Sequence, residues 1–180
     1  MFKQGFLIGL LLCCALVFAG CGGAETAARS DGNTVEQQLS LKAGMTAPDL
    51  ALTSFGGQAV QLATLYQDKP VYLNFWASWC PPCVRELPDI ERAYETYGKD
   101  VHFAAVAIDA KSDDAAAFLE RKNFTMPAYY AAGEQLNRDY HVDAVPLSLL
   151  IAKGGRIVAV RIGAMTGKEL AEFLAPALDK

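Results

Sequence analysis

The sequence has 180 residues, a net charge of −4 and 52% hydrophobic residues. That length suits one ordinary domain with additional segments, and the apolar content is sufficient for a packed core. Lys and Arg are scattered along the chain and form no basic run, which argues against a nucleic-acid-binding face.

The first residues are typical of an export signal. Lys3 supplies a short positive end, and residues 5–19 carry no charge and are mostly apolar. This stretch has the length of a signal-peptide hydrophobic region and is shorter than the ~20 residues that a membrane-spanning helix needs. We therefore expect residues 1–20 to be a signal peptide.

The apolar run ends in VFAGC, residues 17–21, which resembles a bacterial lipobox. The resemblance implies cleavage before Cys21 and lipidation of that cysteine, although Phe18 departs from the leucine usually preferred at its place. The alternative is an uncleaved anchor helix that the following glycines lengthen. Under either interpretation the domain lies outside the cytoplasm, facing the periplasm or the extracellular side, and is held at a membrane.

Of the five cysteines in the sequence, only two are expected to remain as free thiols or a disulfide in the mature chain. Cys13 and Cys14 would leave with the signal peptide, and Cys21 would carry lipid. Cys80 and Cys83 remain, and they can pair only with each other or with a partner protein. An exported compartment permits such disulfides.

Residues 21–40 are small and polar and predict a flexible tether ahead of a domain at 41–180. That domain opens with a hairpin pattern, in which apolar residues alternate on both sides of a Gly-rich turn at 54–57. The alternating residues are Leu50, Leu52, Val60 and Leu62.

The rest of the domain alternates between strand and helix patterns, which predicts an α/β fold with a mixed sheet. Parallel strands would be joined by helices, and an antiparallel hairpin would end the sheet. The expected elements are a buried strand at 71–77, a helix from 81 to 98, a strand at 101–108, a helix from 112, a short helix at 134–140, strands at 147–152 and 156–162, and a helix from 166.

The spacing of Cys80 and Cys83 favours exchange chemistry over a structural staple. A disulfide between them closes a short loop, for which chain entropy predicts only roughly 2 kcal/mol of stabilisation. The pair also follows a buried strand and opens a helix, where free N–H groups and the helix dipole stabilise a thiolate. We expect Cys80 to be the nucleophile and the more exposed sulfur, and Cys83 to resolve the mixed disulfide.

The segment Asn74–Cys83, NFWASWCPPC, with Val145-Pro146 before a later strand, resembles the thioredoxin fold and more narrowly the TlpA/ResA group of exported thiol–disulfide oxidoreductases. Residues 44–50, GMTAPDL, match that group's N-terminal extension, so the resemblance covers about 41–180. It implies a thioredoxin-like α/β fold with a mixed central sheet flanked by helices and an N-terminal β-hairpin extension. Members often act as reductases, for example in cytochrome c maturation.

The resemblance also implies roles for residues outside the cysteine pair. Pro146 matches the family's cis-proline, which packs opposite the cysteines and helps to dock an extended partner strand beside Val145. Glu86 lies on the helix face of Cys83, three residues further on, and matches a functional glutamate of ResA-like proteins. Its carboxylate would exchange the proton of the resolving thiol. The alternative is a solvated helix glutamate.

Further residues of the motif are expected to shape the site. Pro81 and Pro82 remove two N–H donors, which should tune the reduction potential. With Trp79, they are expected to contact clients, whereas Trp76 is expected in the core. Asn74 stands where thioredoxin has a buried acid, and an amide cannot exchange a proton.

Three other functions use some of the same residues. An oxidant would share every site residue named above. A copper carrier could use the two thiols and His141, but a structural zinc site lacks ligands. A thiol peroxidase would need Pro and Thr or Ser where Leu73 and Ala77 stand.

The expected reaction requires no metal and no cofactor beyond the redox-active Cys80–Cys83 disulfide. The expected partners are client proteins that carry thiols or disulfides, and a membrane thiol-relay protein as electron donor. A reductase in an oxidising compartment depends on such a relay because its electrons have to cross the membrane.

Overall fold

The computed structural model describes residues 41–178, so the expected signal peptide, lipidated Cys21 and tether lie outside the described residues. The elements, in chain order, are β1 (Ala51–Ser54), β2 (Ala59–Gln61), α1 (Leu62–Asp68), β3 (Val71–Trp76), α2 (Pro81–Tyr97), β4 (His102–Ala107), α3 (Ser112–Lys122), β5 (Ala128–Tyr130), α4 (Gly133–Gln135), the π-helical segment η1 (Leu136–Tyr140), β6 (Leu147–Ile151), β7 (Ile157–Ile162) and α5 (Gly167–Leu178).

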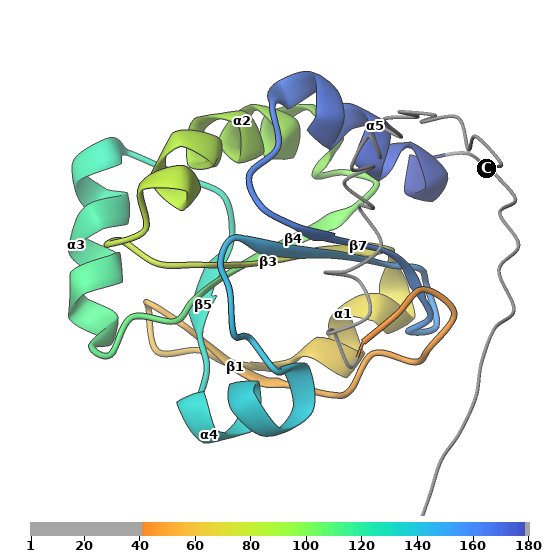
Figure 1. Ribbon diagram of the computed structural model, residues 1–180, viewed down its shortest axis with the longest axis horizontal. Helices are drawn as coiled ribbons and strands as arrows, with labels where there is room; N and C mark the ends of the chain where they lie inside the picture. The colour runs from red at the N-terminus through yellow and green to blue at the C-terminus, as the bar shows by residue number, and fades with distance from the viewer. Residues whose placement is uncertain (1–40, 179–180) are drawn as a thin grey trace, which may run out of the picture. The chain divides into compact units, whose positions relative to one another are not determined.

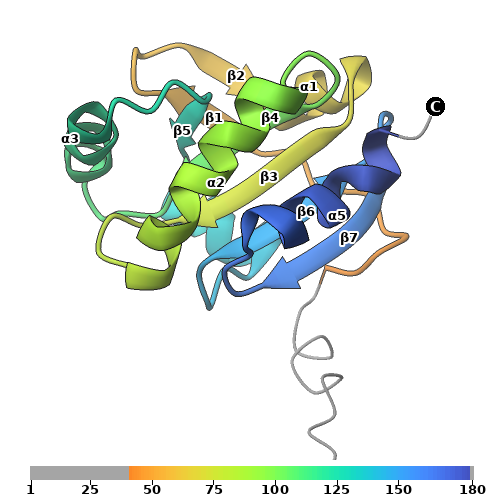
Figure 2. The same ribbon diagram turned by 90° about the horizontal axis from the view of Figure 1, so that it is seen from above.

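Seven strands form one mixed sheet in the order β2-β1-β5-β4-β3-β6-β7. Strand β3 runs parallel to β4 and antiparallel to β6, and β6 pairs with β7 as the expected terminal hairpin. Helices α2 and α5 lie over one face of the sheet, and α1 and α4 lie over the other (Figures 1 and 2). The predicted thioredoxin-like architecture, with a mixed sheet flanked by helices, is confirmed.

Strand β3 contributes to two hydrophobic cores, one on each face of the sheet. All six of its residues are buried, as the near-continuous apolar pattern predicted for a strand covered on both faces. Because successive side chains point to opposite faces, Tyr72 and Trp76 join the cluster beneath α2 and α5. Leu73 and Phe75 join the cluster that includes Tyr140 on the other side.

The N-terminal hairpin is confirmed, but Leu62 does not lie on its second strand as predicted. It opens α1 instead, because donors at the start of that helix find partners: Leu62 N–H bonds the Leu50 carbonyl at 3.0 Å, and Ala63 N–H bonds the Asp49 carboxylate at 2.8 Å. Leu62 and Tyr66, one helical turn apart, are then both buried.

The sequence patterns do not predict β5, and the family resemblance implies the hairpin only as an N-terminal extension. Strand β5 has three residues and pairs parallel with β4 and antiparallel with β1. It therefore joins the hairpin to the main sheet. A strand this short carries no readable alternation, because its conformation is set by the two ladders on either side of it.

Helix α2 begins and ends as expected, and α5 begins as expected. Helix α2 starts at Pro81 with Cys80 as its N-cap, passes through Pro88 and is capped by Gly98. At the start of α5, Thr166 and Glu169 form the predicted capping box, with Thr166 N–H donating to the Glu169 carboxylate at 2.8 Å. Within residues 41–178, none of the helices has the length and apolar content to cross a membrane.

Candidate active site

Cys80 and Cys83 form a disulfide at the start of α2, just past the end of β3. The Cys83 backbone N–H donates to Cys80 Sγ at 3.3 Å, so the sulfur itself caps the helix. Cys80 is 4% exposed and Cys83 1%, so the predicted order of exposure holds, although both are largely covered. Access to the pair is therefore through the surface beside Cys80.

The segment before β6 lies against the cysteines. Pairing of Phe75 with Leu147 in the β3–β6 ladder places this segment beside the start of α2. Its Val145 carbonyl oxygen is 3.6 Å from Cys80 Sγ, and the Val145–Pro146 peptide bond is cis, as the family resemblance implied. A backbone carbonyl thus faces the sulfur that we expect to react.

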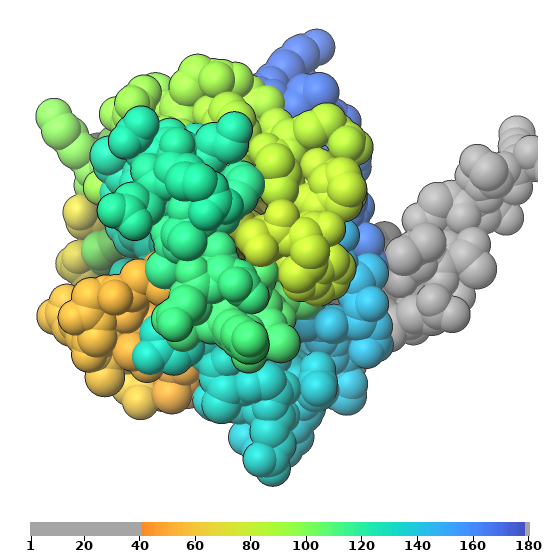
Figure 3. Space-filling model, turned by 90° about the vertical axis from the view of Figure 1, so that its left-hand side faces the viewer, coloured from red at the N-terminus to blue at the C-terminus, as the bar shows by residue number. Residues whose placement is uncertain are grey.

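A mainly apolar groove borders Cys80. Figure 3 shows this side of the molecule, where the yellow-green start of α2 lies beside the cyan segment that precedes β6. Trp79, Pro81, Pro82 and Val145, all predicted to contact clients, lie along the groove. Sequence reasoning missed the other lining residues, because they come from the end of β4 and from a loop without a pattern: Ile108, Val142, Asp143 and Ala144.

Glu86 is buried, so its interpretation as a solvated helix glutamate is wrong. It is 2% exposed, and its Oε1 accepts the Met165 backbone N–H at 3.0 Å. Its Oε2 has no hydrogen-bond partner among the described residues. Burial raises the pKa of Glu86 to about 7, against the opposing effect of the Met165 N–H, and the charge of Asp89 adds to the rise. Such a carboxyl group can take up or release a proton near neutral pH.

Asn74 is one of several buried polar residues on the sheet face that α2 covers. Its Nδ2 donates to Ser148 Oγ at 3.0 Å, and the Tyr72 hydroxyl lies 3.0 Å from the same oxygen. Burial raises the pKa of Tyr72 far above its usual range, and the nearby Glu86 adds to this effect. Tyr72 and Ser148, which sequence reasoning missed, thus hold β3 and β6 together beneath α2.

Ser78 and Asp109 form a second interaction that the sequence patterns did not indicate, where β3 and β4 end beside the cysteines. The Asp109 carboxylate accepts the Ser78 N–H, at 3.2 and 3.1 Å to its two oxygens, and also the Ser78 hydroxyl. Ser78 follows β3 and Asp109 follows β4. These strands are parallel neighbours with Trp76 opposite Ala107, so their ends meet at one edge. A serine and an acid after two predicted parallel strands were the available signal.

The two histidines are not part of the cysteine site. His102 pairs with Val71 at the opposite end of the β3–β4 ladder, and its Nε2 lies 3.2 Å from the Asp68 carboxylate. His141 is exposed and precedes the groove segment. Among residues 41–178, no three His, Cys, Asp or Glu side chains are grouped so as to hold a metal ion.

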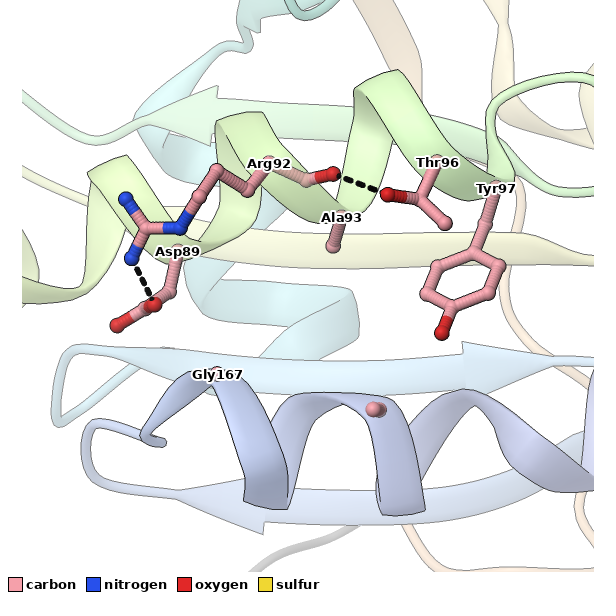
Figure 4. A pocket seen from close by; sticks show the side chains of 7 residues that line it. Asp89, Arg92, Ala93, Thr96, Tyr97 and Gly167 are labelled. Atoms are coloured by element: carbon pink, nitrogen blue, oxygen red, sulfur yellow. Dashed lines mark hydrogen bonds and ion pairs between the residues drawn. The ribbon is translucent and has the colours of Figure 1, made fainter.

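A separate small hollow lies between α2 and α5 (Figure 4). Asp89 and Arg92 form an ion pair at its rim. The helices approach closely here: a Cβ on Gly167 would lie 2.8 Å from Asp89 Oδ1. The close approach of Gly167 to Asp89 places the start of α5 against α2. Gly167 follows Met165, whose N–H binds Glu86, by two residues.

Comparisons with known proteins agree with this geometry. The family model described as Redoxin matches residues 42–175. The thiol-disulfide oxidoreductase ResA of Geobacillus thermodenitrificans is 33% identical over 143 residues, which cover 79% of this chain and 82% of that protein. ResA of Bacillus thuringiensis subsp. konkukian is 29% identical, with 93% and 91% covered.

Solved structures show the same fold. A Chlorobium tepidum protein assigned as the thiol:disulfide interchange protein DsbE superimposes with a TM-score of 0.71 at 33% identity, covering 78% of this chain and all of that one (100%). The pneumococcal exposed lipoprotein thioredoxin Etrx1 from Streptococcus pneumoniae superimposes with a TM-score of 0.64 at 25% identity, covering 72% and 99%.

Proposed function

Because the chain belongs to the Redoxin family, and within it to the ResA-like thiol–disulfide oxidoreductases of the thioredoxin superfamily, we propose that it reduces disulfides in client proteins outside the cytoplasm. The observation that supports this most is the position of Cys80. Its sulfur caps α2, faces the Val145 carbonyl and borders an open apolar groove.

In the proposed reaction the reduced protein attacks first. The Cys80 thiolate forms a bond to one sulfur of the client disulfide, that disulfide breaks, and the other client sulfur leaves as a thiolate. The Cys83 thiolate then attacks Cys80 Sγ, which releases the second client thiol and forms the Cys80–Cys83 disulfide. Two electrons thus pass to the client. A dithiol donor then reduces the Cys80–Cys83 disulfide and is itself oxidised to a disulfide.

The groups around the cysteines would assist these steps. The Cys83 N–H and the N-terminal end of α2 stabilise negative charge on Cys80 Sγ. Glu86, with its pKa raised to about 7, would take the proton of Cys83 as that thiol becomes the attacking group. An extended client segment would lie in the groove and pair with the backbone beside Val145.

The Cys80–Cys83 couple is the only redox group that this proposal needs. Clients with disulfides outside the cytoplasm include apocytochromes, whose haem-attachment cysteines must be reduced, and we propose cytochrome c maturation as one role. A membrane thiol-relay protein would supply the electrons. The alternative, a disulfide-forming oxidant, uses the same residues in the reverse direction.

The reduction potential of the Cys80–Cys83 couple tests the direction of electron flow. It is measured by equilibrating the purified domain with glutathione buffers and quantifying both redox forms. We expect a value near that of thioredoxin, about −270 mV. A value near that of DsbA, about −120 mV, would overturn the reductase assignment in favour of the oxidant.

We also propose that the protein is anchored by lipid on Cys21. The lipobox-like residues 17–21 support this, as does the likeness to a structure described as an exposed lipoprotein. Cys21→Ser should move the protein from the membrane fraction to the soluble fraction. Cys14→Ser, within the expected signal peptide, should leave it in the membrane fraction, and equal partitioning of both variants would contradict the anchor.

A further inference from the structure

Trp79 is an exposed apolar residue in the middle of the site. It is 64% exposed, whereas Ala77 and Cys80 beside it are buried. The Cys80 N–H bonds the Ala77 carbonyl at 3.2 Å, so Ser78 and Trp79 are the two central residues of the turn that leads from β3 to the cysteines. Because little of this side chain is packed against neighbours, the backbone of the turn sets the direction in which it leaves the chain.

Asp109 holds that turn from the segment that follows β4. Its carboxylate accepts both the N–H and the hydroxyl of Ser78. Ile108, the residue before Asp109, is also held in place, because its N–H donates to the Trp76 carbonyl at 2.9 Å. The carboxylate is therefore carried on the end of the sheet, and charge-assisted hydrogen bonds of this kind are short and directional.

We infer that Asp109 is a positioning residue for client exchange: through Ser78 it sets the direction of Trp79 and so the shape of the groove wall beside Cys80. Ile108, its neighbour, lines the same groove as Trp79. The inference rests on the proposed docking of clients in that groove. Asp109 itself need not touch the reacting sulfurs.

The chain contains a matched control for this arrangement. Glu91 on α2 accepts the Thr125 N–H at 2.8 Å, the Thr125 hydroxyl at 2.6 Å and the Met126 N–H at 3.0 Å. It thus clamps a loop by the same chemistry as Asp109. The residues that it holds do not line the groove beside Cys80, so Glu91→Ala reports the loss of a comparable clamp elsewhere.

The test compares Asp109→Ala, Asp109→Asn and Glu91→Ala with the unchanged protein. Each reduced protein is reacted with a disulfide-bonded peptide, and each oxidised protein with dithiothreitol, which needs no groove. We expect Asp109→Ala to slow the peptide reaction by about tenfold, which is less than the ~100-fold that a 1 Å misplacement of reacting groups can cost, and to leave the dithiothreitol rate nearly unchanged. Asp109→Asn, which keeps an acceptor oxygen, should recover part of the peptide rate.

Fluorine NMR gives a readout that general destabilisation would not produce. The chain has two tryptophans, so 5-fluorotryptophan labelling yields two signals, which Trp79→Phe assigns. Asp109→Ala should shift and narrow the Trp79 signal and leave that of Trp76 in place. Glu91→Ala should change neither signal and neither rate.

The inference is overturned if Asp109→Ala reacts with the peptide as fast as Glu91→Ala, or if its peptide and dithiothreitol rates fall equally. If Asp109→Ala does not fold, Ser78→Ala replaces it, because that variant removes the hydroxyl bond and keeps the N–H bond. It should shift the Trp79 signal and slow the peptide reaction by a smaller factor. An unchanged protein that fails to react with any peptide would refute the proposed function instead.

Discussion

The buried carboxylate of Glu86 accepts the backbone N–H of Met165 at 3.0 Å, across the contact between α2 and α5. One end of this contact lies one helical turn past Cys83, and the other lies in the segment that leads into α5. A group that can gain or lose a proton near neutral pH therefore connects the cysteine helix to the C-terminal helix.

Replacement of Glu86 by Gln should remove a pH dependence of the free energy of unfolding. The unfolded chain ionises Glu86 near pH 4.5, whereas the folded protein keeps the proton until about pH 7. Between these values the folded state binds more protons, so the oxidised protein loses stability as pH rises. The total loss is on the order of 3 kcal/mol and is complete above the folded pKa.

Urea denaturation of the oxidised protein across this pH window measures the effect. Glu86→Gln should show a flatter curve than the unchanged protein. Glu120→Gln, which alters an exposed glutamate on α3, should follow the unchanged protein. Parallel curves for all three proteins would show that Glu86 does not hold its proton in the folded state.

The two tryptophans of the motif should respond in opposite ways to replacement by Ala. Trp76 is fully buried and packs against Phe118, so Trp76→Ala should cost about 3–5 kcal/mol of stability. Trp79 is 64% exposed, so Trp79→Ala should change stability by less than about 0.5 kcal/mol. Its effect should instead appear as slower exchange with protein disulfides.

Thermal or urea unfolding, together with the rate of client reduction, separates the two effects. Reduction by dithiothreitol is the control for intact cysteine chemistry. A large loss of stability in Trp79→Ala, or client exchange at the unchanged rate, would contradict the assignment of Trp79 to the client surface.

Tyr72→Phe should destabilise the protein by about 1 kcal/mol, because it removes the hydroxyl that bonds Ser148 and leaves the ring packing in place. A double-mutant cycle with Ser148→Ala should show coupling between the two positions. Tyr94→Phe, which removes the hydroxyl of a half-buried tyrosine that packs against Phe103, is the matched control. Additive losses for Tyr72 and Ser148 would mean that their contact contributes nothing.

Cys83→Ala should accumulate mixed disulfides with clients through Cys80, because the resolving thiol is gone. Non-reducing electrophoresis followed by mass spectrometry identifies the adducts and the cysteine that carries them. Cys80→Ala should form none. The reverse pattern, with adducts on Cys83 alone, would exchange the roles of the two cysteines.

Local features of the sequence determined much of this protein. The apolar run of β3 and the proline-rich start of α2 specify a strand followed by a helix, and they place the cysteines between them. The spacing of Cys80 and Cys83 and their place at a helix start point to exchange chemistry. The capping box of Thr166 and Glu169 is likewise read from neighbouring residues, because each of these features depends on contacts within one or two helical turns.

Other features depended on packing between distant segments and could only be decided by the tertiary structure. The sequence placed Glu86 on the helix face of Cys83 but left its burial open, and its raised pKa follows from that burial in the folded protein. Strand β5 exists because β1 and β4 pair with it, and Asp109 reaches Ser78 because two parallel strands end together. Desolvation and long-range hydrogen bonding arise from the assembled elements, so no local pattern encodes them.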